Sequence, residues 1–356
     1  MAVPSRPPGD RRRRTTRGRA AAALAACLGL LAAGCGESTS RQPGAHGMPR
    51  EVRVFTCCVS GTEIPVWLAY DKGLFAKYGL PASVLKLVPP PTGGAALISG
   101  STDIGNDAPS DVINATAAGN HDLELVAGKT SKPVFRIMSK KLTDPRQIRG
   151  RRLGVSGKFA PPALAAYAYL HDRFGLEPDK DYTVVPAAQI SDLVSTLAGG
   201  AVDAAVLSTP LNIAARKQGA HEVADLSGQV AEANSYVMTT KQFAKEYPAA
   251  VEAYLKAVID AMALARSDRP ATVASIRRHQ QGLTEQAAET VYEDYADILD
   301  PNMYEDALRT YVDYPSTPDV GEVDVKPLMN DTFLRRLDRQ GFLKDHGFAL
   351  KTGDVQ

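Results

Sequence analysis

Three short stretches of the sequence contain residue types that could do chemistry. Cys57 and Cys58 are adjacent thiols, residues 128–130 (Gly-Lys-Thr) are similar to the end of a phosphate-binding loop, and residues 154–158 approach a Gly-x-Ser-x-Gly nucleophile motif. The phosphate loop needs a Gly where this chain has Leu123, and the nucleophile motif needs a Gly where it has Lys158. The six His are scattered, without the spacing of a zinc site. The sequence therefore predicts no catalytic residue, no metal site and no cofactor.

The first 34 residues have the pattern of an export signal. Seven Arg precede an uncharged run over residues 20–34, which is shorter than the ~20 apolar residues that span a bilayer. The run ends in Leu-Ala-Ala-Gly-Cys35, which is similar to a bacterial lipobox. We expect residues 1–34 to be a signal peptide, Cys35 to be lipidated, and residues 35–49 to form a flexible tether on the extracytoplasmic face of the cell membrane.

The remainder of the chain is weakly acidic. Without the first 34 residues, 34 basic and 39 acidic residues remain, which is a net charge of −5. Nucleic-acid binding requires clustered Lys and Arg, so this class is excluded. Adjacent Cys57 and Cys58 cannot link distant segments, so burial must stabilise the fold. We expect a monomer.

One pattern occurs twice, and it predicts a duplicated unit. Leu-x-x-Gly-x-x-Asp stands at residues 97–103 and again at 197–203. Each copy closes a predicted helix and precedes a strand, a Pro-containing turn and a further helix. Two copies at this distance indicate two α/β units rather than a solenoid, which needs three or more.

Several spaced blocks resemble one protein family. A predicted strand over 51–55 leads into a helix that ends at Gly73, and Phe75 and Gly79-Leu80 follow. The block at 97–105 and a third at 142–155 continue the pattern. Over about residues 50–240 the chain resembles the substrate-binding proteins of ATP-binding-cassette (ABC) importers for nitrate, sulfonate, taurine and thiamine-pyrimidine precursors. The resemblance implies an α/β fold of the type II periplasmic-binding-protein class, with two lobes joined by two hinge crossovers.

The two lobes divide the chain unequally. We expect lobe one to hold residues 50–138 and 236–356, and lobe two to hold 139–235. The crossovers are expected near 137–139 and 236–239, as extended hinge segments. From residue 248 onward the pattern is helical, with helices near 248–266, 270–280, 284–298, 302–312 and 326–340 that cover lobe one.

The candidate binding residues lie in the loops that follow predicted strands and at the second crossover. Open α/β sheets bind ligands at the carboxyl ends of their strands, and the resemblance places the solute between the lobes. The candidates are Cys57, Cys58, Ser60, Thr92, Gly93, Asn106, Asp107, Ser156, Lys158, Phe159, Ser208, Thr209 and Tyr236. Several are equally typical of helix caps or core positions. Lys129-Thr130 is more typical of a loop than of a contact.

The resemblance implies a solute-binding lipoprotein rather than an enzyme. It would deliver a small solute to ABC permease subunits. Lys158 and the helix N-termini favour an anion similar to sulfonate, nitrate or taurine. The alternative solute is a pyrimidine or another heterocyclic vitamin precursor. The alternative functions are an enzyme similar to the pyrimidine-precursor synthases, which have a Cys-rich segment near their substrate, and a sensory ectodomain.

Overall fold

The computed structural model describes residues 47–88, 92–187, 190–231 and 234–351. All of them belong to one unit, Pro43–Gln356. The predicted signal peptide, Cys35 and most of the predicted tether lie outside the described residues. Within the described part of the chain, no helix is long and apolar enough to cross a membrane.

Two five-stranded sheets form the framework, and they share one topology. The first has the strand order β2-β1-β3-β10-β4 and the second β7-β6-β8-β5-β9. In each, four strands run in one direction, and the fifth pairs antiparallel with its two neighbours. The first sheet comprises β1 (Val52–Thr56), β2 (Ala82–Leu87), β3 (Ile104–Asp107), β4 (Leu123–Gly128) and β10 (Tyr236–Thr240). The second comprises β5 (Arg136–Ser139), β6 (Arg152–Val155), β7 (Thr183–Pro186), β8 (Ala204–Leu207) and β9 (His221–Asp225). This common order confirms the two α/β units that the sequence repeat predicts.

The pairing of the antiparallel strands β5 and β10 shows that the hinge segments lie elsewhere than expected. The boundary expected between residues 138 and 139 falls inside β5, and all four residues of β5 pair with the second sheet. The expected hinge segment 236–239 likewise belongs to β10 of the first sheet. The chain passes from one sheet to the other in residues 129–135 and 226–235. Sequence alternation identifies such a strand but not the sheet that it joins, which its pairing partners decide.

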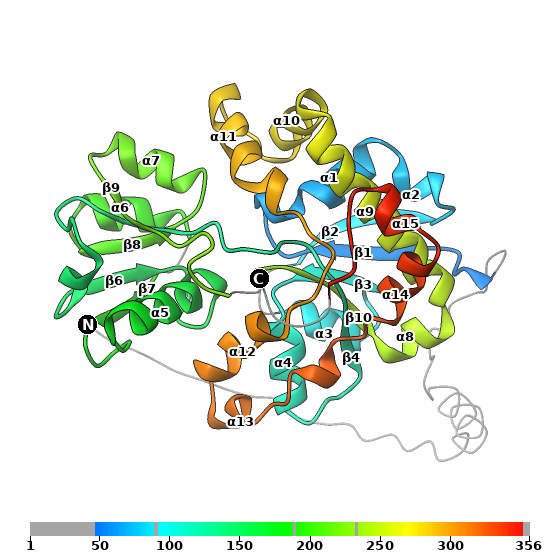
Figure 1. Cartoon of the computed structure of the whole chain (residues 1–356), viewed down its shortest axis with the longest axis horizontal. Helices are drawn as coiled ribbons and strands as arrows, with labels where there is room; N and C mark the ends of the chain where they lie inside the picture. The colour runs from blue at the N-terminus through cyan, green and yellow to red at the C-terminus, as the bar shows by residue number, and fades with distance from the viewer. Residues whose placement is uncertain (1–46, 89–91, 188–189, 232–233, 352–356) are drawn as a thin grey trace, which may run out of the picture. The chain divides into compact units, whose positions relative to one another are not determined.

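Helices connect the strands and cover the sheets. Those that follow β1, β2 and β3 are α1 (Ile64–Asp71), α2 (Leu74–Lys77), α3 (Gly93–Ile98) and α4 (Ser110–Ala117), and α1 is preceded by a 3₁₀ turn, η2 (Gly61–Glu63). Those of the second sheet are α5 (Pro161–Phe174), α6 (Asp192–Ala198) and α7 (Leu211–Lys217), with η3 (Pro145–Ile148) before β6. The two faces of β8 bury different neighbours. Ala204 and Val206 belong to a cluster with α5, whereas Ala205 and Leu207 pack with α6. Figure 1 accordingly shows α5 and α6 on opposite faces of this sheet.

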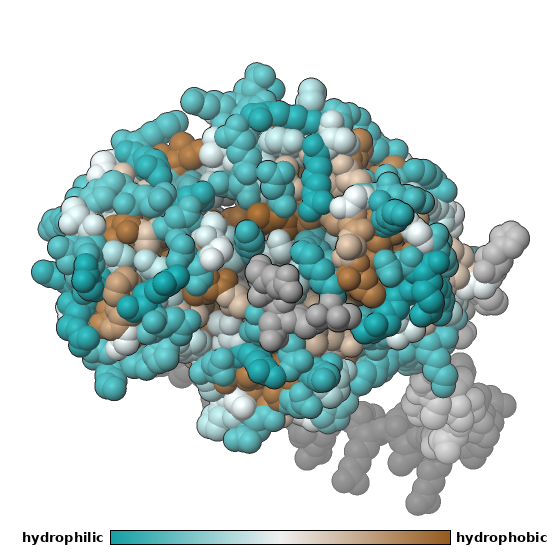
Figure 2. All heavy atoms as spheres, in the orientation of Figure 1, coloured by the Kyte–Doolittle hydropathy of each residue, from teal (hydrophilic) through white to brown (hydrophobic). Residues whose placement is uncertain are grey.

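The C-terminal third is helical, as the sequence predicts, with one difference. Its elements are α8 (Lys241–Glu246), α9 (Pro248–Ser267), α10 (Arg269–His279), α11 (Glu285–Tyr295), η4 (Ala296–Ile298), α12 (Glu305–Asp313), α13 (Pro318–Gly321), η5 (Lys326–Leu328), α14 (Thr332–Arg339) and α15 (Phe342–Asp345). The helix expected over 326–340 is interrupted, because Met329 pairs with Leu125 at the edge of β4 and the Asn330 N–H donates to the Leu125 carbonyl at 2.8 Å. Helix α9 is the central one, with eleven buried side chains. On the face seen in Figure 2, hydrophilic residues predominate and hydrophobic residues form separate patches.

Candidate functional site

The first group of candidate residues follows β1. The Cys57 N–H donates to the Asn106 carbonyl at 3.1 Å, so this loop continues from the sheet in a fixed direction. The Sγ atoms of Cys57 and Cys58 are 3.0 Å apart, and both side chains are half-buried free thiols. Ser60 caps η2 by accepting a hydrogen bond from the Thr62 N–H. The loop therefore places two thiols and one hydroxyl at the carboxyl end of β1.

Asp107 ends β3 beside this loop. Its Oδ1 accepts a hydrogen bond from the Ala108 N–H at 2.7 Å, whereas Oδ2 is buried without a hydrogen-bond partner in the described part of the chain. Burial, together with the nearby negative charge of Asp111, raises the pKa of Asp107 to about 7. Asp111 on α4 accepts from the Gly94 N–H at 2.7 Å, and burial raises the pKa of this carboxyl group as well. Two carboxyl groups thus lie behind the loop that carries the thiols.

Sequence reasoning missed a buried ion pair at the same end of the sheet. Lys129 was expected in a loop without a role, but its side chain is fully buried and its Nζ is 2.7 Å from Glu63 Oε1. Burial raises the pKa of Glu63, and Lys129 opposes that effect. Glu63 Oε2 has no hydrogen-bond partner among the described residues. No local motif predicts this pair, because it joins η2 to the segment after β4, 66 residues later.

Cys57, Cys58 and Glu63 are close enough to be considered as a metal site. One potential ligand atom from each lies within 4.8 Å of the others. Glu63, however, already accepts a hydrogen bond from the Lys129 ammonium group at 2.7 Å. A cation bound here would be repelled by that buried positive charge. We therefore describe these residues as a cluster of thiols and carboxylates and assign no metal to it.

The candidates of the second sheet follow β6 and β8. Ser156 and Ser208 are half-buried, Thr209 is buried, and Phe159 is 44% exposed. Lys158 differs from its expected role as a free cation, because its Nζ is 2.6 Å from Asp179 Oδ2. Its positive charge is therefore balanced within the second lobe.

Helix α11 joins the two groups of loops. The Tyr295 hydroxyl is 3.3 Å from Ser60 Oγ, and Ser208 is near enough to lower the pKa of Tyr295, so one buried side chain lies beside the loops after β1 and β8. Burial raises the pKa of Tyr295 above its ordinary value, which keeps the phenol protonated. A Cβ atom at Gly61 would overlap the Tyr295 ring, so this approach requires a glycine.

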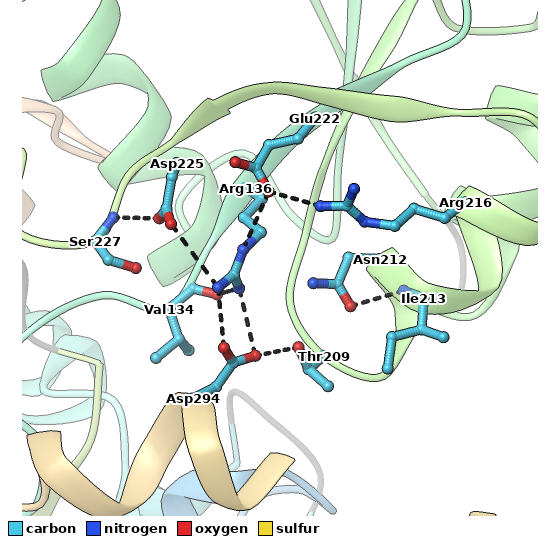
Figure 3. A network of polar contacts seen from close by, with 10 residues as sticks. All are labelled: Val134, Arg136, Thr209, Asn212, Ile213, Arg216, Glu222, Asp225, Ser227 and Asp294. Carbon is cyan, nitrogen blue, oxygen red and sulfur yellow. Dashed lines mark hydrogen bonds and ion pairs between the residues drawn. The ribbon is translucent and has the colours of Figure 1, made fainter. Parts of the chain in front are cut away.

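The residue before Tyr295 makes a second link (Figure 3). Asp294 Oδ1 is 2.9 Å from Nη2 of Arg136, the first residue of β5, and Asp294 also accepts a hydrogen bond from the Thr209 hydroxyl. Arg136 in turn faces Glu222 and Asp225 on β9. We expected this helix only to cover lobe one, and no sequence motif marks Asp294 or Tyr295.

The remaining candidates are used inside the first lobe. Asn106 is fully buried; its Nδ2 donates to the Phe55 carbonyl and its Oδ1 accepts from the Tyr254 hydroxyl, both at 2.9 Å. Gly93 is buried where a Cβ would overlap Asp111 and Phe55. Tyr236 is buried in β10 and paired with Asp107 in the sheet, and Thr92 is exposed just before α3. Asn106 and Gly93 thus position the loops.

Two cavities of the described part lie away from these residues. One, of about 430 Å³, is lined by residues of α5 and α12 that include His171, Asp172 and Thr310. The other, of about 380 Å³, is lined by α4 and by residues 319–328. Neither is lined by a candidate binding residue. At the candidate site the Tyr295 side chain lies between the loops of the two sheets.

Two sheets of one topology, with polar loops linked across their carboxyl ends, define the periplasmic-binding-protein fold. The sequence model of the NMT1/THI5-like family matches residues 62–271, which is more than half of the chain, and the protein belongs to this family. No curated protein matches the chain.

Solved structures with the same fold bind different compounds. The periplasmic aliphatic sulphonate binding protein SsuA from Escherichia coli is 23% identical, with a TM-score of 0.58 over 69% of this chain and 84% of its own. The periplasmic nitrate-binding protein NrtA from Synechocystis is 14% identical, with a TM-score of 0.60 over 83% and 90%. A DSZB mutant in complex with biphenyl-2-sulfinic acid is 18% identical, with a TM-score of 0.60 over 82% and 99%. At these identities the likeness shows the shared fold.

Proposed function

We propose that this protein captures a small solute between the loops at the carboxyl ends of its two sheets and delivers it to an ABC importer. The observation that carries the proposal is the double link from α11. Tyr295 reaches Ser60 and Ser208, and Asp294 reaches Arg136 and Thr209. A solute that contacts both sets of loops would stabilise the closed arrangement by as much as its contacts there exceed those in the open one.

The charges around the loops favour a solute that donates hydrogen bonds. Each of the three nearby cations is paired with a carboxylate: Lys129 with Glu63, Lys158 with Asp179, and Arg136 with Asp294. The N-termini of the helices offer little to an anion, because the Gly94 N–H is bonded to Asp111, and Pro161 and Pro162 remove two N–H groups from the start of α5.

Two hydrogen-bond acceptors near the loops of the first sheet have no donor among the residues that the structure describes. Glu63 Oε2 and Asp107 Oδ2 are buried and have no hydrogen-bond partner in the described chain. A pyrimidine-like heterocycle with an amino group suits these acceptors better than a bare sulfonate or nitrate. We therefore prefer the heterocycle. The second candidate is a sulfonate that also carries an amine, such as taurine, because the fold is shared with a sulphonate-binding protein.

Solute class is tested by thermal unfolding of the protein with a 4-aminopyrimidine, taurine, an alkylsulfonate and nitrate in separate samples. A solute at ~100 times its Kd should stabilise the folded state by about 2.7 kcal/mol, which is a shift of a few degrees. The aminopyrimidine is expected to give the largest saturable shift. A larger shift with nitrate or the alkylsulfonate would overturn the preferred class, and chemical turnover of any solute would overturn the function as a carrier.

Membrane attachment is tested separately at Cys35. We propose that cleavage before Cys35 and acylation of its thiol anchor the protein on the extracytoplasmic face, where a permease could receive the solute. The full chain expressed in a bacterium should partition into detergent, and the Cys35→Ser variant should not, because about 0.8 kcal/mol of anchoring per acyl CH₂ is lost. Equal partitioning of the two proteins would contradict lipidation.

A further inference from the structure

Within the described part of the chain, the adjacent thiols of Cys57 and Cys58 form a reactive pair to which the proposed function assigns no role. Their sulfur atoms are 3.0 Å apart as free thiols, and a disulfide bond is ~2.05 Å long. The two atoms thus need to approach by about one ångström. Neither side chain is fully buried, so a small oxidant can reach the pair.

A bond between neighbouring residues differs from a structural disulfide. Consecutive Cα atoms are ~3.8 Å apart, below the ~4.4 Å at which ordinary disulfides begin. The ring that closes is therefore strained, and strained disulfides are more readily reduced. Because the bond joins neighbouring residues, it closes no loop of the chain. It therefore hardly lowers the entropy of the unfolded state and contributes almost nothing to the free energy of unfolding. Such a bond suits reversible control.

The loop around the thiols is held at both ends. The Val88 N–H donates to the Thr56 carbonyl at 2.9 Å and the Cys57 N–H to the Asn106 carbonyl at 3.1 Å. Beyond the thiols, Ser60 caps η2 and contacts Tyr295. Closing the ring must therefore displace the segment in between, Cys58 and the exposed Val59, which leads directly to Ser60.

We propose that Cys57 and Cys58 form a reversible disulfide, and that this bond changes the affinity of the site for its solute. The hydrogen bond with Cys58 and burial raise the pKa of Cys57, so the Cys58 thiolate attacks the oxidised disulfide compound first and expels one thiolate from it. The Cys57 thiol then loses its proton, attacks the mixed disulfide and expels the other thiolate. Cys57 and Cys58 together lose two electrons and two protons, and the oxidant becomes two thiols. The change in affinity rests on the function proposed above, whereas the disulfide itself does not.

Mass spectrometry of the full chain tests the bond. After oxidised glutathione treatment, the tryptic peptide 54–72, which holds both thiols and no other Cys, should lose the mass of two hydrogens and regain it with dithiothreitol. The Cys57→Ser variant is the matched control and should carry one glutathione on Cys58, which shows that the oxidant reaches the loop. A wild-type peptide that stays reduced, or that retains glutathione as its final product, overturns the proposal.

Calorimetric titration with the 4-aminopyrimidine and with taurine tests the consequence. Oxidised and reduced protein should differ in Kd by threefold or more for the compound that binds, and treating the oxidised protein with dithiothreitol should restore the Kd of the reduced protein. Equal Kd values with the bond formed overturn redox control and leave the carrier function standing. If neither compound binds the reduced protein, the solute class fails, while the mass measurement still decides the disulfide.

Discussion

Asp107 shows at the scale of one residue how position changes an ordinary side chain. In water its carboxyl group would be charged above pH 4. At the end of β3 it is 5% exposed, it lies near Asp111, and its pKa rises to about 7. The charged form loses hydration and gains a like-charged neighbour. The residue can therefore accept or donate a proton near neutral pH.

Asp107 should make stability fall as the pH rises. Its pKa is 3.8 in the unfolded chain and about 7 in the folded protein, so the folded protein binds this proton more tightly. The free energy of unfolding then decreases between about pH 4 and pH 7, at roughly 1.4 kcal/mol per unit or less. Asp107→Asn removes this term, so the stability of the variant relative to wild type should increase over the same range in urea unfolding. Parallel curves for the two proteins would contradict the raised pKa.

At the scale of elements, the duplicated Leu-x-x-Gly-x-x-Asp pattern makes the same set of hydrogen bonds in both sheets. Asp103, before β3, accepts hydrogen bonds from the backbone N–H and the guanidinium of Arg53; Asp203, before β8, does the same with Arg152. The antiparallel strand adds a hydroxyl in each sheet, since Thr239 donates to the Asp103 carbonyl and Ser139 to the Asp203 carbonyl, both at 2.7 Å. The pattern therefore ties the third strand of each unit to the first.

The Asp103–Arg53 and Asp203–Arg152 pairs differ in burial. The same Asp→Asn substitution should therefore lower the free energy of unfolding by different amounts at the two positions. The Asp103 side chain is fully buried, whereas that of Asp203 is 19% exposed and faces an exposed Arg152. Asp103→Asn should lower the free energy of unfolding by about 2 kcal/mol, because the fully buried carboxylate accepts three hydrogen bonds from Arg53 and an amide cannot accept with both of its terminal atoms. Asp203→Asn should cost about 1 kcal/mol. Chemical unfolding of both variants measures this, and equal losses would show that burial does not decide the difference.

At the scale of the whole molecule, α11 is one of the elements that link the two lobes, together with α12, which packs against α5. Helix α11 packs in the C-terminal region with α10, yet its last two residues contact strands and loops of the second lobe. Arg136, Thr209 and Ser208 are its partners there. The two lobes are thus linked by the protein's own side chains.

Asp294→Asn should favour the open arrangement. It removes the charge that faces Arg136 and should leave the fold of each lobe intact, because the polar contacts of Asp294 with described residues, Arg136 and Thr209, cross from one lobe to the other. Without solute, small-angle scattering should give a larger radius of gyration, and solute affinity should fall about tenfold, which corresponds to about 1.4 kcal/mol. Glu293→Gln is the matched control, since Glu293 is 58% exposed and pairs with Arg269 of α10. The same response in both variants would exclude a specific link through Asp294.

The sequence alone determined what local pattern can specify. The α/β class and the two repeated units follow from short-range periodicity and turn residues, and the family resemblance points to the loops after the strands as the candidate site. The 97–103 and 197–203 blocks are informative because an Asp after a glycine turn meets a partner on the neighbouring strand, which is a short and repeatable contact. The family resemblance rests on the same segments.

Only the tertiary structure decided which charges are free and what lies between the lobes. Lys158 and Lys129 appear similar in the sequence, yet one pairs with Asp179 at the surface and the other with Glu63 in the core. The sheet that β5 joins, the break at Met329, and the positions of Asp294 and Tyr295 likewise depend on contacts between segments far apart in the chain. Pairing, burial and ion-pair partners are properties of such contacts, and no local pattern of residues contains them.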